Sequence, residues 1–279
     1  MSTQIPQRLD ADHRRFVVAR EPHLLHCHHY NTFLLRSILD AHFVDSLPFL
    51  VGAGNEVAFH QLSALFKEAD LQDVGARKEL AAELYRWAGF GVLDLSTLTE
   101  EGGTLQTAHS HYSMAWNAKF GTADAPMDHF TAGWLSGALA AIYDRPQGQF
   151  AVRQTDDMAA GAALNRFTLE GNGDPNYTVF ASPGLGPLTT HEPRPVPETP
   201  VDYDGIFAAL SGMDISGDPQ GVIPAFGVYL TRHYANYYNR ISFEFLREMD
   251  AQFGEMGVEI AEPLLVEAGH VCAFNTFGG

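Results

Sequence analysis

Two segments far apart in the chain carry similar sequences, and this similarity restricts the fold more than any other feature. At an offset of 205 residues, four residues recur: Leu25, His28, Asn31 and Ser37 as Leu230, His233, Asn236 and Ser242. At an offset of 215, FLVGAGNEVAFHQL (49–62) recurs as LLVEAGHVCAFNTF (264–277). The ten-residue difference fits a longer helix in the second segment. The pattern predicts a tandem duplication, with chance similarity between two amphipathic helices as the alternative.

A segment rich in proline and glycine separates the two copies. Residues 171–204 show no helical periodicity, which predicts a loop or linker. We therefore expect a first domain over residues 1–170, this linker, and a partial, mainly helical second copy over residues 205–279. The second copy is shorter than the first by about a hundred residues. It is either a natural fragment or a fold that is completed against another subunit.

Hydrophobic periodicity predicts the main elements. Four segments have helical spacing, namely 31–43, 56–69, 76–91 and 129–143, and glycines 89 and 91 end the third. Residues 104–116 alternate as a strand would, with His109 and His111 on one face. Residues 148–170 predict two strands joined by a tight turn at Gly161. The segments 203–213 and 221–257 are expected to be helical.

Composition limits the possible partners. The hydrophobic fraction of 46% predicts a globular protein with a sizeable core. The formal net charge of −17 would repel phosphate backbones and anionic membranes. There are two cysteines, the first residues form no signal peptide, and no apolar run approaches the ~20 residues of a spanning helix. We expect a cytoplasmic protein that binds neither nucleic acid nor membranes.

One internal segment resembles a known family. A helix rich in small residues carries Phe130, Ala132, Gly133, Trp134 and Gly137, and the following turn carries Ala159, Gly161 and Phe167. Residues 84–169 thereby resemble 4-vinyl-reductase-type domains, in which the turn reads Cys-x-Ala-x-Gly-x-x-x-Cys-x-Phe. The two family cysteines fall on Asp157 and Asn165. A carboxylate and an amide cannot form a thiolate zinc site, so only the structural role of the turn is expected.

The resemblance implies a fold and a class of ligand. The fold is α/β (α+β), related to transport-particle subunits and to ligand-sensing domains of bacterial regulators. Such domains dimerise and bind small, largely apolar ligands such as aromatics, hydrocarbons or tetrapyrrole-like molecules. In this chain the resemblance and the aromatic content predict a pocket lined by Tyr30, Phe33, Tyr112, Trp116, Phe130 and Trp134.

The stretch LLHCHHYNTF (24–33) is the candidate metal site. His26, His28 and His29, together with His109 and His111 and a carboxylate such as Asp128, could ligate iron, zinc or copper. Lining of an aromatic pocket and a purely structural role are the alternatives. Because His28 is matched by His233 in the second copy, His26 and His29 are the better functional candidates and His28 the better structural one.

Three hypotheses about function follow from these patterns. The first is a vinyl-reductase-type domain that binds a small apolar or aromatic ligand in a pocket of aromatic and histidine side chains. The second is a metalloenzyme with a histidine-ligated transition metal that acts on a small molecule. The third is an interaction subunit of a homodimer or a larger homo-oligomer. No phosphate-binding glycine loop, dinucleotide fingerprint or nucleophile elbow is present in the sequence.

Overall fold

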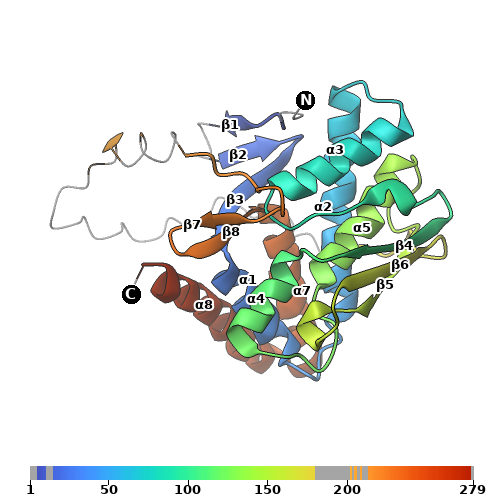
Figure 1. The fold of residues 1–279 in the computed structure, drawn as a ribbon. Helices are drawn as coiled ribbons and strands as arrows, with labels where there is room; N and C mark the ends of the chain where they lie inside the picture. Colours follow the sequence, from blue (N-terminus) through green and yellow to red (C-terminus); the bar gives the residue numbers. More distant parts are fainter. Residues whose placement is uncertain are drawn as a thin grey trace.

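A computed structural model describes residues 5–10, 15–179, 202, 204, 205, 208 and 213–277 of the chain. In this part of the chain, seven α-helices accompany two antiparallel sheets (Figure 1), which confirms the mixed α/β class. Most of the predicted linker, and most of the helix predicted over residues 203–213, lie outside the described residues. No described helix is long and apolar enough to cross a membrane.

The larger sheet joins the two similar segments. Its strand order is β1-β2-β3-β8-β7, with bounds Arg8–Asp10, Arg15–Val18, Glu21–Cys27, Val228–Tyr234 and Ile223–Ala225. β3 and β8 are antiparallel neighbours, with Leu25 opposite Arg232. Figure 1 shows the strands from both ends of the chain side by side. The second copy is therefore part of the same sheet as the first.

Each copy consists of a hairpin followed by two helices. The hairpins β2–β3 and β7–β8 both turn through two residues with positive φ, Ala19–Arg20 and Phe226–Gly227. Two such residues match the right-handed twist of the strands they connect. The helices that follow are α1 (His28–Leu39) and α2 (Leu47–Glu68) in the first copy, and α7 (Ala235–Phe253) and α8 (Glu255–Phe277) in the second. α7 is longer than α1, as expected.

The element boundaries correct two predictions. The helix predicted over residues 221–257 is wrong over residues 223–234, where the turn at Gly227 folds the chain into a hairpin. The predicted offset of 205 residues between the two similar segments is also wrong around the histidines, where the structure gives an offset of 207. His26 and His233 are each the second-last residue of their strand, so the structural counterpart of His233 is His26 rather than His28.

The helices of the two copies pack reciprocally. α8 packs against α1, and α7 packs against α2. Side chains from both copies, among them Leu34, Leu50, Ile241 and Phe245, belong to one buried cluster. The two copies therefore share a hydrophobic core.

Among the described helices, α2 and α5 (His129–Ile142) have the most extensive contact with each other. Every residue of α5 is buried. A methyl group on Gly133 would lie 2.0 Å from the carbonyl oxygen of Val51, and one on Gly137 would lie 2.1 Å from that of Asn55. The glycines therefore let the two backbones touch, as the small residues of this helix predicted. The neighbouring helix α3 (Val74–Trp87) ends before Gly89 and Gly91, which have positive φ and confirm the predicted stop.

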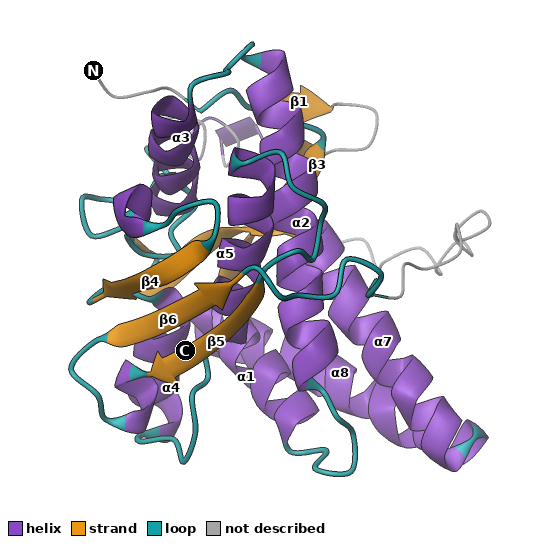
Figure 2. Cartoon of the chain, turned by 90° about the vertical axis from the view of Figure 1, so that its right-hand side faces the viewer, coloured by secondary structure: helices purple, strands orange, loops and turns teal. Residues whose placement is uncertain are grey.

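The smaller sheet covers α5. It has the order β4-β6-β5, with bounds Gly102–Thr107, Asn165–Glu170 and Ala151–Asp156, and β5 contacts α5 (Figure 2). The short helices η1 (Leu95–Thr97) and η2 (Met158–Ala160) precede β4 and follow β5. Gly161, with a φ of +89°, closes the turn after η2 as predicted.

The strand predicted over residues 104–116 is wrong beyond Thr107. The side chain of Ser110 accepts a hydrogen bond from the backbone N–H of Ser113 and caps helix α4 (His111–Phe120). A serine in this position favours the start of a helix over the continuation of a strand. His109 and His111 therefore do not share a strand face.

Candidate functional site

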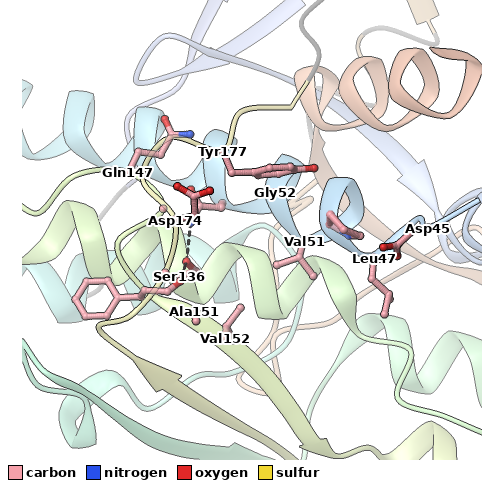
Figure 3. A pocket seen from close by; sticks show the side chains of 15 residues that line it. Asp45, Leu47, Val51, Gly52, Ser136, Gln147, Ala151, Val152, Asp174 and Tyr177 are labelled. Atoms are coloured by element: carbon pink, nitrogen blue, oxygen red, sulfur yellow. Dashed lines mark hydrogen bonds between the residues drawn. The ribbon is translucent and has the colours of Figure 1, made fainter. Parts of the chain in front are cut away.

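A concave pocket of about 490 Å³ opens between α2, α5, β5 and the loop after β6. We call it the α2–α5 pocket. Its lining includes Val51, Gly52, Asn55, Ser136, Phe150 and Val152, together with the exposed residues Asp45, Asp174 and Tyr177. Figure 3 shows the side chains that line the pocket. Most of the lining surface is apolar.

Two uncharged polar side chains lie at the buried end of this pocket. Asn55 Nδ2 donates to Ser136 Oγ (2.6 Å), and Ser136 Oγ donates to the carbonyl oxygen of Phe150 (2.5 Å). Both side chains are buried. The chain of hydrogen bonds fixes Asn55 and Ser136 in place, and such fixed polar groups in an apolar pocket orient ligands.

The loop after β6 forms the outer wall. A methyl group on Gly52 would lie 2.7 Å from Tyr177 Cε1, so only glycine lets Tyr177 lie directly against α2. The backbone N–H of Val179 donates to Glu56 Oε1 (2.6 Å), and Glu56 Oε2 pairs with Arg240 Nε of α7 (2.6 Å). A buried ion pair therefore holds this wall to the second copy.

The charged side chains that line the pocket are all acidic. Asp45 and Asp174 contribute the charged side chains of the lining, which contains no lysine or arginine. Partial burial, together with the negative charge of Glu244, raises the pKa of Tyr177 to about 12. Like an ordinary tyrosine, Tyr177 carries its hydroxyl proton at neutral pH and can donate a hydrogen bond to a ligand. The site is suited to neutral or cationic molecules.

A second group of polar residues, the His233 cluster, lies in the core where the two copies meet. It consists of His26, Asn31, His111, Tyr112, His233 and Tyr238. Tyr112 Oη and His233 Nε2 are 2.7 Å apart, Asn31 Nδ2 donates to His111 Nε2 (3.0 Å), and Tyr238 Oη donates to Asn31 Oδ1. Since the backbone N–H of Tyr234 donates to His233 Nδ1, the imidazole proton lies on Nε2 and points to Tyr112.

Burial keeps these imidazoles neutral. It lowers the pKa of His111 to about 3 and that of His26 to about 4. The pKa of His233 lies well below its usual value because of burial, with smaller contributions from His111 and His26. A neutral imidazole could ligate a metal or pack in a core.

The core around this cluster is closed. The cavity between Asn31, Tyr112, Tyr237 and Tyr238 measures about 10 Å³, which is room for no more than a water molecule. The ligand residues predicted from the sequence lie in or beside this packed region. Phe130 contacts His233, Trp134 Nε1 donates to Tyr234 Oη, Tyr30 packs on His26, and Phe33 and Trp116 contact Phe120. None of the six lines the α2–α5 pocket.

The candidate metal ligands are divided by the end of a strand. His26 belongs to β3, whereas His28 and His29 begin α1, with ring centroids 4.0 Å apart. His28 Nδ1 accepts from the backbone N–H of Tyr229, and the Nδ1 atoms of His26 and His29 are buried without a hydrogen-bond partner. Among the described residues, no three histidine, cysteine, aspartate or glutamate side chains could together hold a metal. The metal prediction therefore gains no support from the geometry.

The positions of the family cysteines form hydrogen bonds. Asp157 accepts from Ser113 Oγ (2.6 Å) and from the backbone N–H of Met127 (2.6 Å). Asn165 Nδ2 donates to Ser113 Oγ (2.8 Å) and to Asp128 Oδ2 (3.2 Å). These bonds tie the β5–β6 turn to α4 and to the start of α5. Burial, aided by the negative charge of Asp157, raises the pKa of Asp128 to about 6.

The sequence did not point to the residues of the α2–α5 pocket. Gly52 and Asn55 belong to the repeated segment 49–62, and Ser136 belongs to the small-residue helix, but both patterns primarily indicate close helix packing. Tyr177 falls in the segment that was predicted to be a linker. The sequence feature that could have pointed to the pocket is Gly52 close to Asn55, on a helix that packs against a second helix rich in small residues.

No family model matches the chain, and a comparison with curated proteins found no match. Among solved structures, one similar chain is the phenol-responsive sensory domain of the transcription activator PoxR, determined with phenol. The match covers 59% of this chain and 84% of that chain, with 13% sequence identity and a TM-score of 0.49. We therefore base the functional proposal on the geometry of this chain.

Proposed function

We propose that the protein binds a small, largely apolar molecule, neutral or cationic, in the α2–α5 pocket. The observation that carries this proposal is the combination of a volume of about 490 Å³ with mainly apolar walls and a fixed polar pair, Asn55 and Ser136. Small-molecule sites usually have volumes of about 300 to 1,000 Å³ and this kind of lining. The His233 cluster lacks comparable space.

The polar groups define how a ligand would lie. Its apolar body would contact Val51, Phe150 and Val152, and a hydrogen-bonding group would face Asn55 and Ser136. A positive group would be favoured at the edge, beside Asp45 or Asp174. An anion would meet these carboxylates and a net charge of −17 without a basic residue in the lining.

The proposed ligand is of the class expected from the sequence, a small and largely apolar molecule. Its proposed site is the α2–α5 pocket instead of a pocket of aromatic and histidine side chains. The aromatic side chains predicted to line the pocket pack in or against the buried core and do not line the α2–α5 pocket. The resemblance to 4-vinyl-reductase-type domains agrees with this class of ligand, and the β5–β6 turn that carries the resemblance is joined to the start of α5 by hydrogen bonds. Metal-dependent chemistry has no geometric basis among the described residues.

Binding can be measured with a pair of fluorescent probes. N-phenyl-1-naphthylamine is neutral and apolar, whereas 1-anilinonaphthalene-8-sulfonate has a similar ring system and a negative charge. We expect saturable binding of the neutral probe at one site per chain and weaker binding of the anionic probe. Val152→Phe should reduce affinity for the neutral probe at least about tenfold by filling the pocket, which corresponds to about 1.4 kcal/mol.

Val258→Phe is the matched control, because Val258 is also half-buried but lies on α8 and does not line the pocket. This variant should bind the neutral probe as the unmodified protein does. Equal affinity in all three proteins, with thermal melts that show folded chains, would refute the proposed site. Tighter binding of the anionic probe would refute the proposed ligand charge.

A further inference from the structure

The two cysteines of the chain lie side by side although they are 245 positions apart in the sequence. Cys27 Sγ and Cys272 Sγ are 3.1 Å apart, and the two are not joined by a disulfide. Cys27 is the last residue of β3 and is buried, whereas Cys272 lies on α8 and is half-buried. The similarity between the two segments does not require this pair, since Cys272 corresponds to Val57 and Cys27 corresponds to Tyr234, the last residue of β8.

Apolar packing holds the two thiols in place. Cys27 is packed among Ile223, Val228 and Leu230 of the β7–β8 hairpin, and Cys272 packs against the same group. α8 is held alongside α1, the helix that begins directly after Cys27. A disulfide, with a length of about 2.05 Å, would therefore need the sulfur atoms to approach by only about 1 Å.

The two thiols differ in access. Cys272 is partly exposed and can meet a small oxidant from solution. Cys27 is buried at the start of α1 with its sulfur 3.1 Å from that of Cys272, so it can reach a sulfenic acid formed on Cys272. An accessible thiol beside a buried one is the arrangement in which a first oxidation product is resolved by a neighbour.

We infer that Cys27 and Cys272 form a site of reversible intramolecular disulfide formation, with a hydroperoxide as the oxidant. The Cys272 thiolate attacks the terminal oxygen of the hydroperoxide, the O–O bond breaks, and a sulfenic acid and an alcohol or water result. The Cys27 thiolate then attacks Sγ of Cys272, the S–O bond breaks, and the departing hydroxide takes up a proton as water. The two thiols together lose two electrons and two protons, which reduce the hydroperoxide.

The bond would join the second copy to the first. It closes a loop of 245 residues, and long loops gain most from a cross-link because the unfolded chain loses most freedom. We expect the melting temperature of the oxidised protein to rise by roughly 5 to 10 °C. A reductant such as dithiothreitol should reverse the shift.

The full chain can be tested directly with one equivalent of hydrogen peroxide. We expect thiol titration to show loss of both thiols, mass spectrometry of the digested protein to show a Cys27–Cys272 cross-linked peptide, and the melt to move upward. Cys272→Ser should show no upward shift with peroxide. Ala273→Ser, at the adjacent exposed position of α8, should respond as the unmodified protein does.

Other products would overturn the inference. If both thiols survive the treatment, or if the cross-link joins two chains, the pair is not an intramolecular disulfide site. An upward shift in Cys272→Ser would also refute it, because the shift would then not depend on this bond. Probe binding at the α2–α5 pocket is a separate measurement, since neither cysteine lines that pocket.

Discussion

Mild acid should destabilise this protein steeply because its core contains neutral imidazoles. Burial lowers the pKa of His23 and His129 to about 4 and that of His111 to about 3, and His233 is shifted in the same direction. In the unfolded chain these groups have a pKa of about 6.5. A lowered pKa in the folded state means that their contribution to stability is present above pH 6.5. It is lost as the pH falls towards the folded pKa.

Hydrogen bonds explain why protonation is opposed. His23 Nδ1 donates to the carbonyl oxygen of Arg232, so His23 Nε2 accepts from the side-chain N–H of Gln61. His111 Nε2 accepts from Asn31 in the same way. A second proton on either ring would face an N–H donor in the core.

The expected magnitude follows from linkage. Between pH 6.5 and 5.0, proton uptake by one histidine of the unfolded chain lowers the free energy of unfolding by between about 1 and 2 kcal/mol. The four buried histidines, His23, His111, His129 and His233, together lower it by about 6 to 7 kcal/mol. Asp128 opposes this effect, because its pKa of about 6 lets the folded chain gain a proton first. That gain stabilises the folded state by about 1 kcal/mol over the same range. The net loss of about 5 kcal/mol is comparable with the whole stability of a small domain.

Urea denaturation at a series of pH values measures this loss directly. At pH 5.5 we expect a slope of about 4 kcal/mol per pH unit. His129→Gln should reduce the slope by about 1.2 kcal/mol per pH unit, and since His129 Nε2 is buried without a partner, it removes no bond at that atom. His42→Gln, at an exposed position, should leave the slope unchanged. A slope below about 1.4 kcal/mol per pH unit, or no change in His129→Gln, would refute the reasoning.

Two further predictions concern the helix pair and the hairpin. Gly133→Ala should lower the free energy of unfolding by about 3 kcal/mol or more, because its methyl group would lie 2.0 Å from the carbonyl oxygen of Val51. Gly171→Ala meets nothing closer than 3.8 Å and should stay within about 0.5 kcal/mol in the same urea titration; equal effects of the two substitutions would contradict the close helix contact. Asp157→Asn removes the negative charge that helps raise the pKa of Asp128, so NMR titration should find that pKa lower than about 6. An unchanged pKa in this variant, with Ser113→Ala as the control for lost hydrogen bonding, would exclude the coupling between the two carboxyl groups.

The sequence predicted correctly those helices and turns that depend on short-range residue patterns. The helix at residues 129–142 and the turn at Gly161 follow from small residues and from glycine, and both are confirmed. The strand predicted through His109 and His111 failed because the capping bond of Ser110 outweighed an alternating pattern. The His233 cluster could not be predicted, since it depends on contacts such as Tyr112 to His233 across 121 residues. Equally, no local signal places Tyr177 against Gly52.

The α2–α5 pocket does not lie where the two similar hairpin-and-helix units meet. The two hairpin-and-helix units meet at Tyr238, whose ring contacts those of His26 and His233, and the cavity of about 10 Å³ beside Tyr238 leaves no space for a ligand. The pocket instead lies between α2 of the first hairpin-and-helix unit and the segment that follows this unit, which supplies α5, β5 and the loop that carries Tyr177. One wall of the pocket therefore belongs to the repeated pattern, and the other walls come from the segment that follows it. Substitutions at Val51 or Val152 should therefore change ligand choice, whereas substitutions at the junction should change stability.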